Sequence, residues 1–401
     1  MSPTLADVVG LLDSWFPPDT AEPWDAPGTV CGDPAAEVRR VMFAVDPTAA
    51  VVDEAVEWGA DLLVTHHPLF LRPVHFVAAT SYKGALVHRL IQGGCALHAA
   101  HTNADAAEEG VADALADLIG LHQTRPLVPR PGTAMDKIVV FVPREHTQAV
   151  LDAMAEAGAG EVGRYSRAAF LGEGTGTFLP GADASPAIGA PGRVERVAEH
   201  RLEMVAPRAR RSAVLRAMLA AHPYEEVAFD VLEPAVLPSS VGIGRVGALA
   251  EPTTLRALAQ KVADALPRTA TGVRVAGDPG TRVRTVAVVG GAGDSLFDAV
   301  RASGADVYVT ADLRHHPASE LRERAALEAG TSDPDRGTPY LIEVSHAASE
   351  WPWLVGAARR LEAQAAARWP GTTVDTRVSM LPTDPWTFRL DPTDRATGGH
   401  P

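Results

Sequence analysis

A chain of 401 residues is too long for one ordinary hydrophobic core, so we expect two or three domains. Apolar residues make up 46% of the sequence and charged residues 21%, which excludes a disordered or fibrous protein. The 36 basic and 50 acidic side chains leave a net charge of −14, which argues against nonspecific binding to nucleic acid or to an anionic membrane.

Cysteine usage and hydropathy indicate a cytoplasmic protein. Cys31 and Cys95 are the two cysteines, and both lie in or beside apolar segments, so a disulfide framework is not expected. No run of about 18 apolar residues occurs, and the first residues lack the basic and apolar regions of a signal peptide. We therefore expect a cytoplasmic protein that does not enter a membrane.

The first 130 residues are predicted to form an α/β unit. Helices are expected at 5–15, 49–58, 82–91 and 111–119, and strands at 38–45, 61–65 and 95–99. The order strand, helix, strand predicts parallel strands joined by right-handed crossovers. Residues 17–37 are expected to be mostly loop, and the Pro-rich stretch 126–131 is expected to be a break.

Residues 133–237 have a different pattern. Strands are expected at 137–142, 202–205 and 226–232, helices at 147–157 and 208–221, and short strands with a mobile loop in the Gly-rich stretch 158–192. Two strand-helix-strand halves predict a ferredoxin-like α+β module inserted into the larger domain. This module contains no compelling chemical cluster.

Residues 241–388 return to the first pattern. Helices are expected at 254–266, 295–302 and 346–367, and strands at 272–276, 285–289, 306–310, 340–344 and 374–378. Residues 59–65 and 304–310 both read Gly-Ala-Asp, then three largely apolar residues, then Thr. We interpret the α/β core as two similar half-domains, residues 1–130 and 241–388, followed by a disordered tail at 389–401.

Imidazoles and carboxylates follow three of the predicted strands. In open α/β sheets, ligands bind at such strand ends. His346 and Glu350 are four residues apart at the start of a helix, so both can project from one face. Taken alone, each cluster could also be a surface or loop contact satisfied by backbone groups. Together the clusters supply ligands that suit Zn, Mn or Fe: His66, His67, Asp105, His346 and Glu350.

Five such ligands exceed the requirement of one four-coordinate structural zinc. Two metal ions bridged by a carboxylate or a water would use the surplus, and such pairs activate water. His98 and His101 follow the same pattern at the third strand, where they could orient a ligand or carry protons in catalysis. Packing or turn roles are the alternative for these two histidines.

At these residues the sequence resembles the GTP cyclohydrolase 1 type 2 homolog family, the dinuclear-metal-centre hexameric proteins. The resemblance reaches to about Trp386 and includes the insert, whose segment 221–230 is similar to the end of the signal-transduction-protein-like module of longer members. The matching motifs are Thr65-His66-His67-Pro68, His101 to Asp105, Gly293-Asp294-Ser295, Gly304 to His316, and His346 to Glu350.

This resemblance implies two divalent metal ions held by the five residues named above, two similar α/β halves, and a toroidal homohexamer with its metal sites facing an internal cavity. Asp312, His315 and His316 follow the second copy of the repeated strand, and we expect them to bind the substrate. One departure is Ala311, where the family more usually has Gly before the acidic residue.

Two functions from different classes remain. The first is a dinuclear metal-dependent hydrolase acting on a small nucleotide-like or phosphorylated substrate. The family name implies GTP cyclohydrolase-type activity, although no residue singles out guanine. The second is a metal-binding or regulatory hexameric assembly, gated by the inserted module and without turnover.

Overall fold

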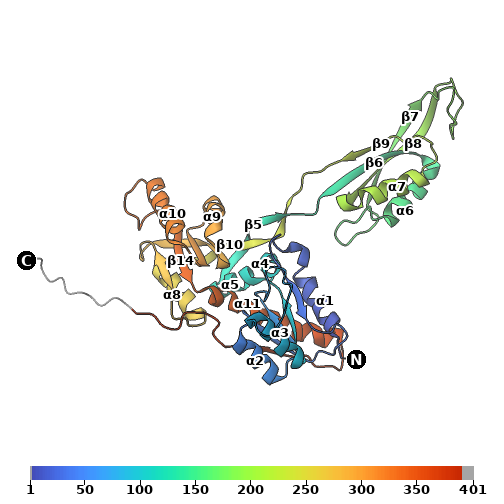
Figure 1. The fold of residues 1–401 in the computed structure, drawn as a ribbon. Coiled ribbons are helices and arrows are strands. Elements are labelled where there is room, and N and C mark those ends of the chain that lie inside the picture. Colours follow the sequence, from blue (N-terminus) through green and yellow to red (C-terminus); the bar gives the residue numbers. More distant parts are fainter. Residues whose placement is uncertain (1, 391–401) are drawn as a thin grey trace, which may run out of the picture. The chain divides into compact units, whose positions relative to one another are not determined.

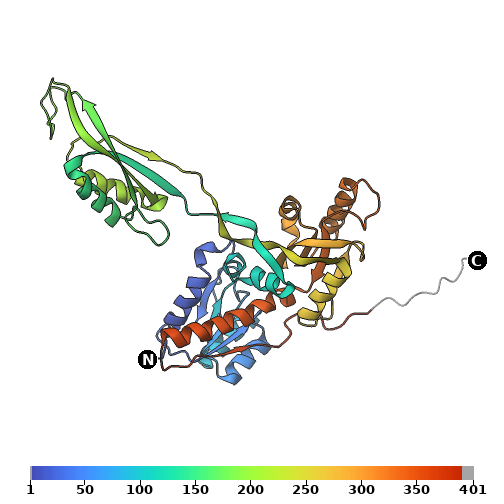
Figure 2. The same cartoon turned by 180° about the vertical axis from the view of Figure 1, so that it is seen from behind.

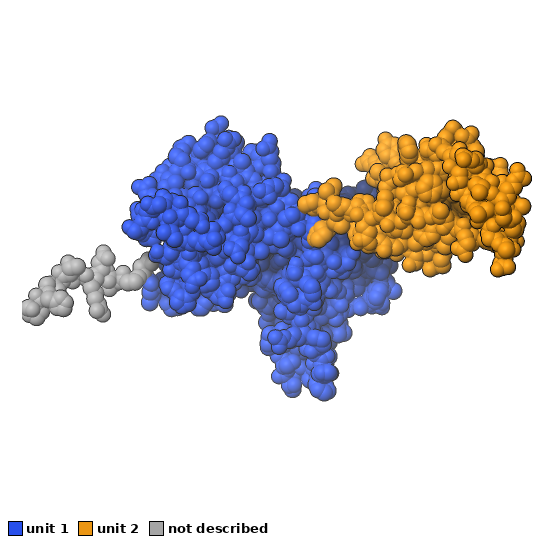
Figure 3. Space-filling model, turned by 90° about the horizontal axis from the view of Figure 1, so that it is seen from above, with its two compact units in different colours: residues 1–130, 240–401 blue, residues 131–239 orange. Residues whose placement is uncertain are grey.

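The computed structural model describes residues 2–390. Residues 131–239 form one compact unit and the rest of the described chain forms another (Figure 3). The predicted disordered tail lies outside the described residues from residue 391 onward. None of the helices within 2–390 combines the length and the hydropathy needed to cross a bilayer.

The larger unit contains a five-stranded sheet (Figure 1). Adjacent strands of this sheet are parallel, except that β1 pairs antiparallel with β4 at one edge. In spatial order the strands are β1 (Gly28–Cys31), β4 (Ala96–Ala99), β3 (Leu62–Thr65), β2 (Arg40–Ala44) and β15 (Asp375–Val378). Its helices are α1 (Leu5–Trp15), α2 (Ala49–Trp58), α3 (Tyr82–Gln92), α4 (Thr102–Ala106) and α11 (His346–Arg368).

Alternation along the strands sends apolar side chains to both faces of this sheet. Phe43 and Val64 pack with α1 and α11 on one face, which Figure 2 shows from the side of the long α11. Met42 and Leu63 pack with α2 and α3 on the other face. Because both faces are covered, the strand ends are the places where polar side chains can gather.

The larger unit also contains a six-stranded sheet (Figure 1). In spatial order its strands are β11 (Arg274–Ala276), β14 (Tyr340–Val344), β13 (Val307–Ala311), β12 (Arg282–Ala292), β10 (Pro238–Thr254) and β5 (Leu121–Pro131). Two helices pack on each face: α5 (Val111–Ile119) and α8 (Leu255–Ala265) on one, α9 (Phe297–Ser303) and α10 (His315–Glu328) on the other.

The two sheets repeat one local arrangement. Gly59 and Gly304 both end a helix with left-handed φ angles of 71° and 74°. The carboxylate that follows, Asp61 or Asp306, accepts hydrogen bonds from two successive backbone N–H groups at the neighbouring parallel strand, at 2.7 and 2.8 Å for Asp61 and at 2.8 Å each for Asp306. The sequence repeat therefore has the same structural role in both sheets.

The smaller unit is an antiparallel four-stranded sheet with two helices on one face. The chain passes through β6, α6, β7, β8, α7 and β9, and the spatial order of the strands is β7, β8, β6, β9. These elements are β6 (Met135–Pro143), α6 (Thr147–Glu156), β7 (Ala169–Phe178), β8 (Glu195–Pro207), α7 (Arg211–Ala221) and β9 (Phe229–Leu232).

Several segments differ from the sequence prediction, and one of them is β10, because no strand is expected at 238–254. The expected break at 126–131 belongs to β5, an edge strand, where proline is tolerated because its missing N–H faces no partner. The Gly-rich stretch contains β7, ten residues long and fully paired with β8. The expected loop at 17–37 contains β1, and α10 has no counterpart among the expected elements.

Candidate metal centre

Strand ends and the start of α11 bring histidines and carboxylates together in the larger unit. His66 and His67 directly follow β3, and their ring centroids are 5.0 Å apart because the chain leaves the strand before Pro68. The ring of His101, at the start of α4, lies 5.2 Å from that of His66. His346 begins α11, and its ring lies 5.1 Å from that of His67.

All four rings are held through Nδ1. The contacts are His66 with the carbonyl of Ala100 at 3.0 Å, His67 with Asp46 at 2.7 Å, His101 with Asp25 at 2.7 Å, and His346 with Asp312 at 2.6 Å. Each oxygen is an acceptor, so Nδ1–H donates, and Nε2 is the nitrogen that can bind either a metal ion or a second proton. Metal-binding histidines are oriented by this kind of contact on the other ring nitrogen.

The spacing of the Nε2 atoms fits a shared metal ion. Nε2 of His67 and Nε2 of His346 are 3.3 Å apart. Two nitrogens bound to one tetrahedral zinc at about 2.0–2.1 Å would be separated by about the same distance. Two groups of residues each place one possible ligand atom per residue within 4.8 Å of the others. The groups are His66, His67 and His101, and His67, His346 and Glu350.

Glu350 contacts histidines of both groups. Its Oε1 is 3.0 Å from Nε2 of His346 and 3.5 Å from Nε2 of His66, and its Oε2 is 3.3 Å from Nε2 of His67. Asp105 Oδ1 is 3.7 Å from Nε2 of His66. Glu350 Oε2 and His66 Nε2 are buried without a hydrogen-bond partner, which costs roughly 1–3 kcal/mol per group unless a ligand satisfies them.

Nearby carboxylates stabilise the protonated, positively charged form of the histidines in the cluster. Burial lowers the pKa of His67, but the nearby carboxylates of Glu350 and Asp46 together outweigh it and the pKa rises to about 11. Burial and Glu350 oppose each other in the same way at His346, whose pKa rises to about 9. Burial raises the pKa of Glu350, yet the charges of His67 and His66 hold it well below its usual range. A divalent cation would supply positive charge at the same place.

Gly291 allows the sheet to approach these ligands closely. Its φ angle is +68°, and a Cβ atom there would lie 2.6 Å from Oε1 of Glu350 and 3.1 Å from Nε2 of His346. The N–H of Gly291 donates to Oγ of Ser349 at 2.8 Å. The sequence predicts a tight turn at 290–293, and the contact with α11 adds a reason for glycine.

His98 does not join the cluster. Its side chain is buried, Nδ1 contacts Oγ1 of Thr29 at 3.1 Å, and Nε2 lies 3.8 Å from Oδ1 of Asp13. Burial lowers the pKa of His98 to about 4, so the ring is neutral at neutral pH. Its recorded contacts are therefore with β1 and α1.

The residues expected to bind substrate have different positions. Asp312, with a left-handed φ of 52°, contacts His346 and lines the cavity beside it. The methyl group of Ala311 is buried within β13. The left-handed backbone conformation belongs to the next residue, Asp312. His315 and His316 are exposed at the start of α10, with their rings 5.1 Å apart, and they do not line that cavity.

This cavity has a volume of about 590 Å³ and is lined by His67 and His346. Arg274 lines it as well and forms an ion pair with Glu343 at 2.5 Å. Trp386 adds an aromatic side chain that is 66% exposed. A cationic group and an aromatic surface therefore lie beside the candidate metal ligands.

Sequence reasoning missed Asp46 and Asp25. Asp46 follows β2 by two residues, much as His66 follows β3, so the strand-end argument could have found it. Asp25 lies in the loop before β1 and also accepts hydrogen bonds from the N–H and hydroxyl of Thr102. Nothing in that loop's sequence indicates this role.

Comparisons with known proteins agree with these observations. Residues 3–385 match the family Duf34/NIF3 (NGG1p interacting factor 3). A Mycobacterium tuberculosis protein named GTP cyclohydrolase 1 type 2 homolog is 51% identical over 387 residues, covering 96% of this chain and 97% of its own. A Streptomyces coelicolor protein of the same name is 39% identical over 399 residues, covering 99% of each chain.

Solved structures show the same relationship. A Bacillus cereus protein related to NIF3 is 35% identical and superposes with a TM-score of 0.71, covering 97% of this chain and all of its own. The Staphylococcus aureus protein SA1388 is 27% identical, with a TM-score of 0.79 and the same coverage. The resemblance inferred from the motifs is confirmed, and the chain belongs to the Duf34/NIF3 family of GTP cyclohydrolase 1 type 2 homologs.

Proposed function

We propose that this protein is a dinuclear metal-dependent hydrolase acting on a small nucleotide-like or phosphorylated substrate. The observation that carries the proposal is the convergence of four imidazoles, each held through Nδ1, around the buried carboxylate of Glu350, which contacts three of them. Two divalent ions, Zn, Mn or Fe, would activate a water molecule and polarise the bond to be broken.

The contacts support an assignment of ligands to each ion. We assign His66, His101 and Asp105 to one ion and His67 and His346 to the other, with Glu350 as the bridge. His101 thereby moves from the expected role of proton carrier to that of ligand. The contacts of His98 with Thr29 and Asp13 support a structural role rather than the catalytic role expected.

The lining of the cavity of about 590 Å³ supports a nucleotide-like or phosphorylated substrate. A guanidinium binds phosphate oxygens, and an aromatic ring stacks on a nucleobase. We therefore add Trp386 and Arg274, whose guanidinium would exchange Glu343 for a phosphate group, to the substrate-binding candidates, ahead of His315 and His316, which do not line the cavity. GTP cyclohydrolase-type activity is one member of this class, and the relatives' names support including GTP in the assay.

The architecture supports two further proposals. The repeated Gly-Ala-Asp contacts support an origin of the core from two similar half-domains. The strand order of the smaller unit supports a ferredoxin-like module. From the family resemblance we also propose a cytoplasmic toroidal homohexamer, which the mass measured by analytical ultracentrifugation would test.

Metal analysis and a substrate panel test the proposal. The purified protein, loaded with Mn or Zn, is expected to hold two ions per chain and to turn over a nucleotide or a phosphoester. The His66→Ala, Glu350→Ala double variant is expected to lose both properties, whereas the His315→Ala, His316→Ala variant keeps the metals. Full metal binding by the first variant would remove the ligand assignment, and no turnover across the panel would remove the hydrolase.

The second candidate function is a regulatory metal-binding assembly without turnover. A separate cavity within the smaller unit is the observation that favours it. Intact metal binding and ligand-dependent changes in assembly, with no turnover, would support this function over the first.

A further inference from the structure

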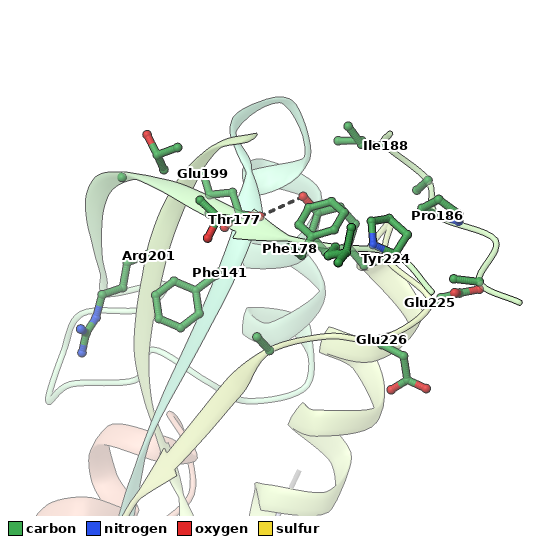
Figure 4. A pocket seen from close by; sticks show the side chains of 18 of the residues that line it. Phe141, Thr177, Phe178, Pro186, Ile188, Glu199, Arg201, Tyr224, Glu225 and Glu226 are labelled. Carbon is green, nitrogen blue, oxygen red and sulfur yellow. Dashed lines mark hydrogen bonds between the residues drawn. The ribbon is translucent and has the colours of Figure 1, made fainter. Parts of the chain in front are cut away.

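A cavity of about 690 Å³ lies wholly within the smaller unit (Figure 4). It is on the sheet face opposite α6 and α7, because Glu199 and Arg201 line it while the alternating Leu202 and Met204 pack against those helices. The rings of Phe141, Phe178 and Tyr224 form part of its wall. This cavity shares no lining residue with the candidate metal centre.

Glycines in β7 make room for a buried carboxylate. Gly174 pairs with Glu199 across the β7–β8 ladder, and Gly176 is the next residue on the same face. A Cβ atom at Gly176 would lie 2.1 Å from Oε2 of Glu199. The carboxylate of Glu199 therefore lies against the backbone of Gly176, in space that a side chain at position 176 would occupy.

The charge of Glu199 has no counterion within the described chain. The residue is 7% exposed, and Oε1 accepts a hydrogen bond from the hydroxyl of Tyr224 at 2.8 Å, as Figure 4 shows. Within residues 2–390, no Lys, Arg or His nitrogen forms an ion pair with it. Buried carboxylates are normally paired with a cation, so the cavity lacks one positive group.

Other charges around the cavity also favour a cation. Glu225 and Glu226 line it, and they add negative charge. Arg201 is the arginine of the lining, and its guanidinium pairs with Glu203 at 2.7 Å. An anion would therefore meet excess negative charge without a free cation to bind.

Aromatic rings beside the carboxylate narrow the ligand class. Phe178 and Tyr224 meet edge to face, with centroids 5.7 Å apart at 62°. Ring faces attract ammonium groups, and a carboxylate among such rings is a recurrent site for organic amines. A hydrated metal ion would gain little from these rings or from the apolar Pro186 and Ile188 beyond them (Figure 4).

We propose that this cavity binds a small organic cation, a primary or quaternary amine, whose nitrogen pairs with Glu199 beside the rings of Phe178 and Tyr224. The site belongs to the smaller unit and is independent of the proposed hydrolase reaction. Its occupancy would give the insert a ligand of its own.

Isothermal titration calorimetry on the full-length, metal-loaded protein tests this proposal. Choline and putrescine are the quaternary and primary amine probes, and 3,3-dimethylbutan-1-ol is the neutral isostere of choline. We expect at least one amine to bind, and the neutral alcohol and inorganic phosphate not to bind. Glu199→Gln removes the charge without changing the shape, and we expect it to weaken amine binding by about tenfold or more.

Two further variants separate recognition from folding. Phe178→Leu removes a ring and is expected to weaken binding severalfold, whereas Glu173→Gln changes a lining carboxylate already paired with Arg144 at 2.9 Å and is expected to bind normally. Near-ultraviolet circular dichroism checks the fold of each variant. Equal binding of the neutral isostere, unchanged affinity in Glu199→Gln, or no binding of either amine at millimolar concentration would overturn the proposal.

Discussion

Each imidazole of the cluster is oriented by one oxygen atom that accepts a hydrogen bond from Nδ1–H. This contact determines which ring nitrogen is available to a metal ion. Asp46 and Asp312 accept hydrogen bonds from Nδ1–H of His67 and His346, and the two Nε2 atoms face each other at 3.3 Å. Without these carboxylates either ring could rotate or change tautomer. If the proposed metal centre is correct, its affinity for metal depends on residues that do not themselves contact the ion.

Asp312→Ala is expected to lower the affinity for Zn or Mn by ~10–100-fold, because His346 loses the acceptor that orients it. Competition with a chromogenic chelator would measure the change. Asp384→Ala is the matched control, since Asp384 lines the same cavity but contacts Ser345 rather than a ring. Equal losses in the two variants would point to cavity charge instead of ring orientation.

The buried His98 predicts a pH dependence of stability. Burial lowers its pKa in the folded state from 6.5 to about 4, so the unfolded chain binds a proton more readily than the folded chain. Its contribution is fully present above pH 6.5 and is lost as the pH falls toward 4, where the loss reaches about 3 kcal/mol.

Chemical denaturation of the metal-free protein between pH 7 and pH 4 would measure this loss. His98→Asn is expected to remove about 3 kcal/mol of the pH dependence, whereas His88→Asn, at an exposed position, should leave it unchanged. Identical pH profiles for wild type and His98→Asn would contradict the assignment of a buried neutral ring.

At the scale of elements, the site depends on how closely β12 approaches α11. His346 and Glu350 occupy the first turns of α11, and the backbone of Gly291 at the end of β12 lies against both side chains. Buried side chains farther along α11, including Trp353, fix that helix on the first sheet. The helix thus joins the metal ligands to the core of the larger unit.

Gly291→Ala is expected to reduce metal stoichiometry and stability together. The new methyl group would displace Glu350 or His346, and alanine at a φ of +68° adds backbone strain of roughly 1 kcal/mol. Gly304→Ala is the matched control, because its φ is +74° but nothing lies within 4 Å of the new Cβ.

Metal analysis by mass spectrometry and thermal denaturation would separate the two effects. Both variants should lose similar backbone stability, and Gly291→Ala alone should lose metal. Full metal content in Gly291→Ala would show that the close approach has no bearing on the site.

At the scale of the whole molecule, each unit has its own core and its own cavity. All six proposed metal ligands belong to the larger unit. The insert leaves and rejoins that unit through β5 and β10, which are neighbours in one sheet. Where the two chain segments enter and leave the insert, the N–H of Gly132 donates a hydrogen bond to the carbonyl of Leu237 at 2.8 Å.

This hydrogen bond makes a clean deletion possible. Replacing residues 133–236 with Asn-Gly should close a two-residue hairpin turn between Gly132 and Leu237. The shortened protein is expected to keep two metal ions per chain, measured by mass spectrometry, and to lose amine binding. Loss of the metals despite a folded core would mean that the insert supports the metal site.

Changes in turnover or in the mass of the assembly after this deletion would support regulation by the insert. Unchanged turnover and mass would argue against gating and leave the amine site without an effect on the core. The same variant therefore discriminates between the two candidate functions.

Much of the larger unit could be predicted from the sequence. Apolar runs such as 62–64, stopped by Gly and Pro, predict strands, and helical spacing of apolar residues predicts α1, α2 and α5. Prediction was wrong or incomplete where pairing overrides local composition: the expected break at 126–131 belongs to a strand, and the short strands expected in 158–192 include one of ten residues. Prolines in β5 and glycines in β7 lower strand propensity, and each segment is a strand because a neighbouring strand supplies its hydrogen bonds.

By itself the sequence determined the family, the strand ends that carry reactive side chains, and the ligand types that suit a divalent metal. The tertiary structure decided which of these side chains meet, because contacts such as His67 with Asp46 and Gly291 with Glu350 join residues far apart in the chain. It separated His98 from His101 although three residues part them, since the end of β4 turns one ring toward α1 and the other toward the ligands. Local pattern sets where a strand ends, but only packing sets what lies opposite that end.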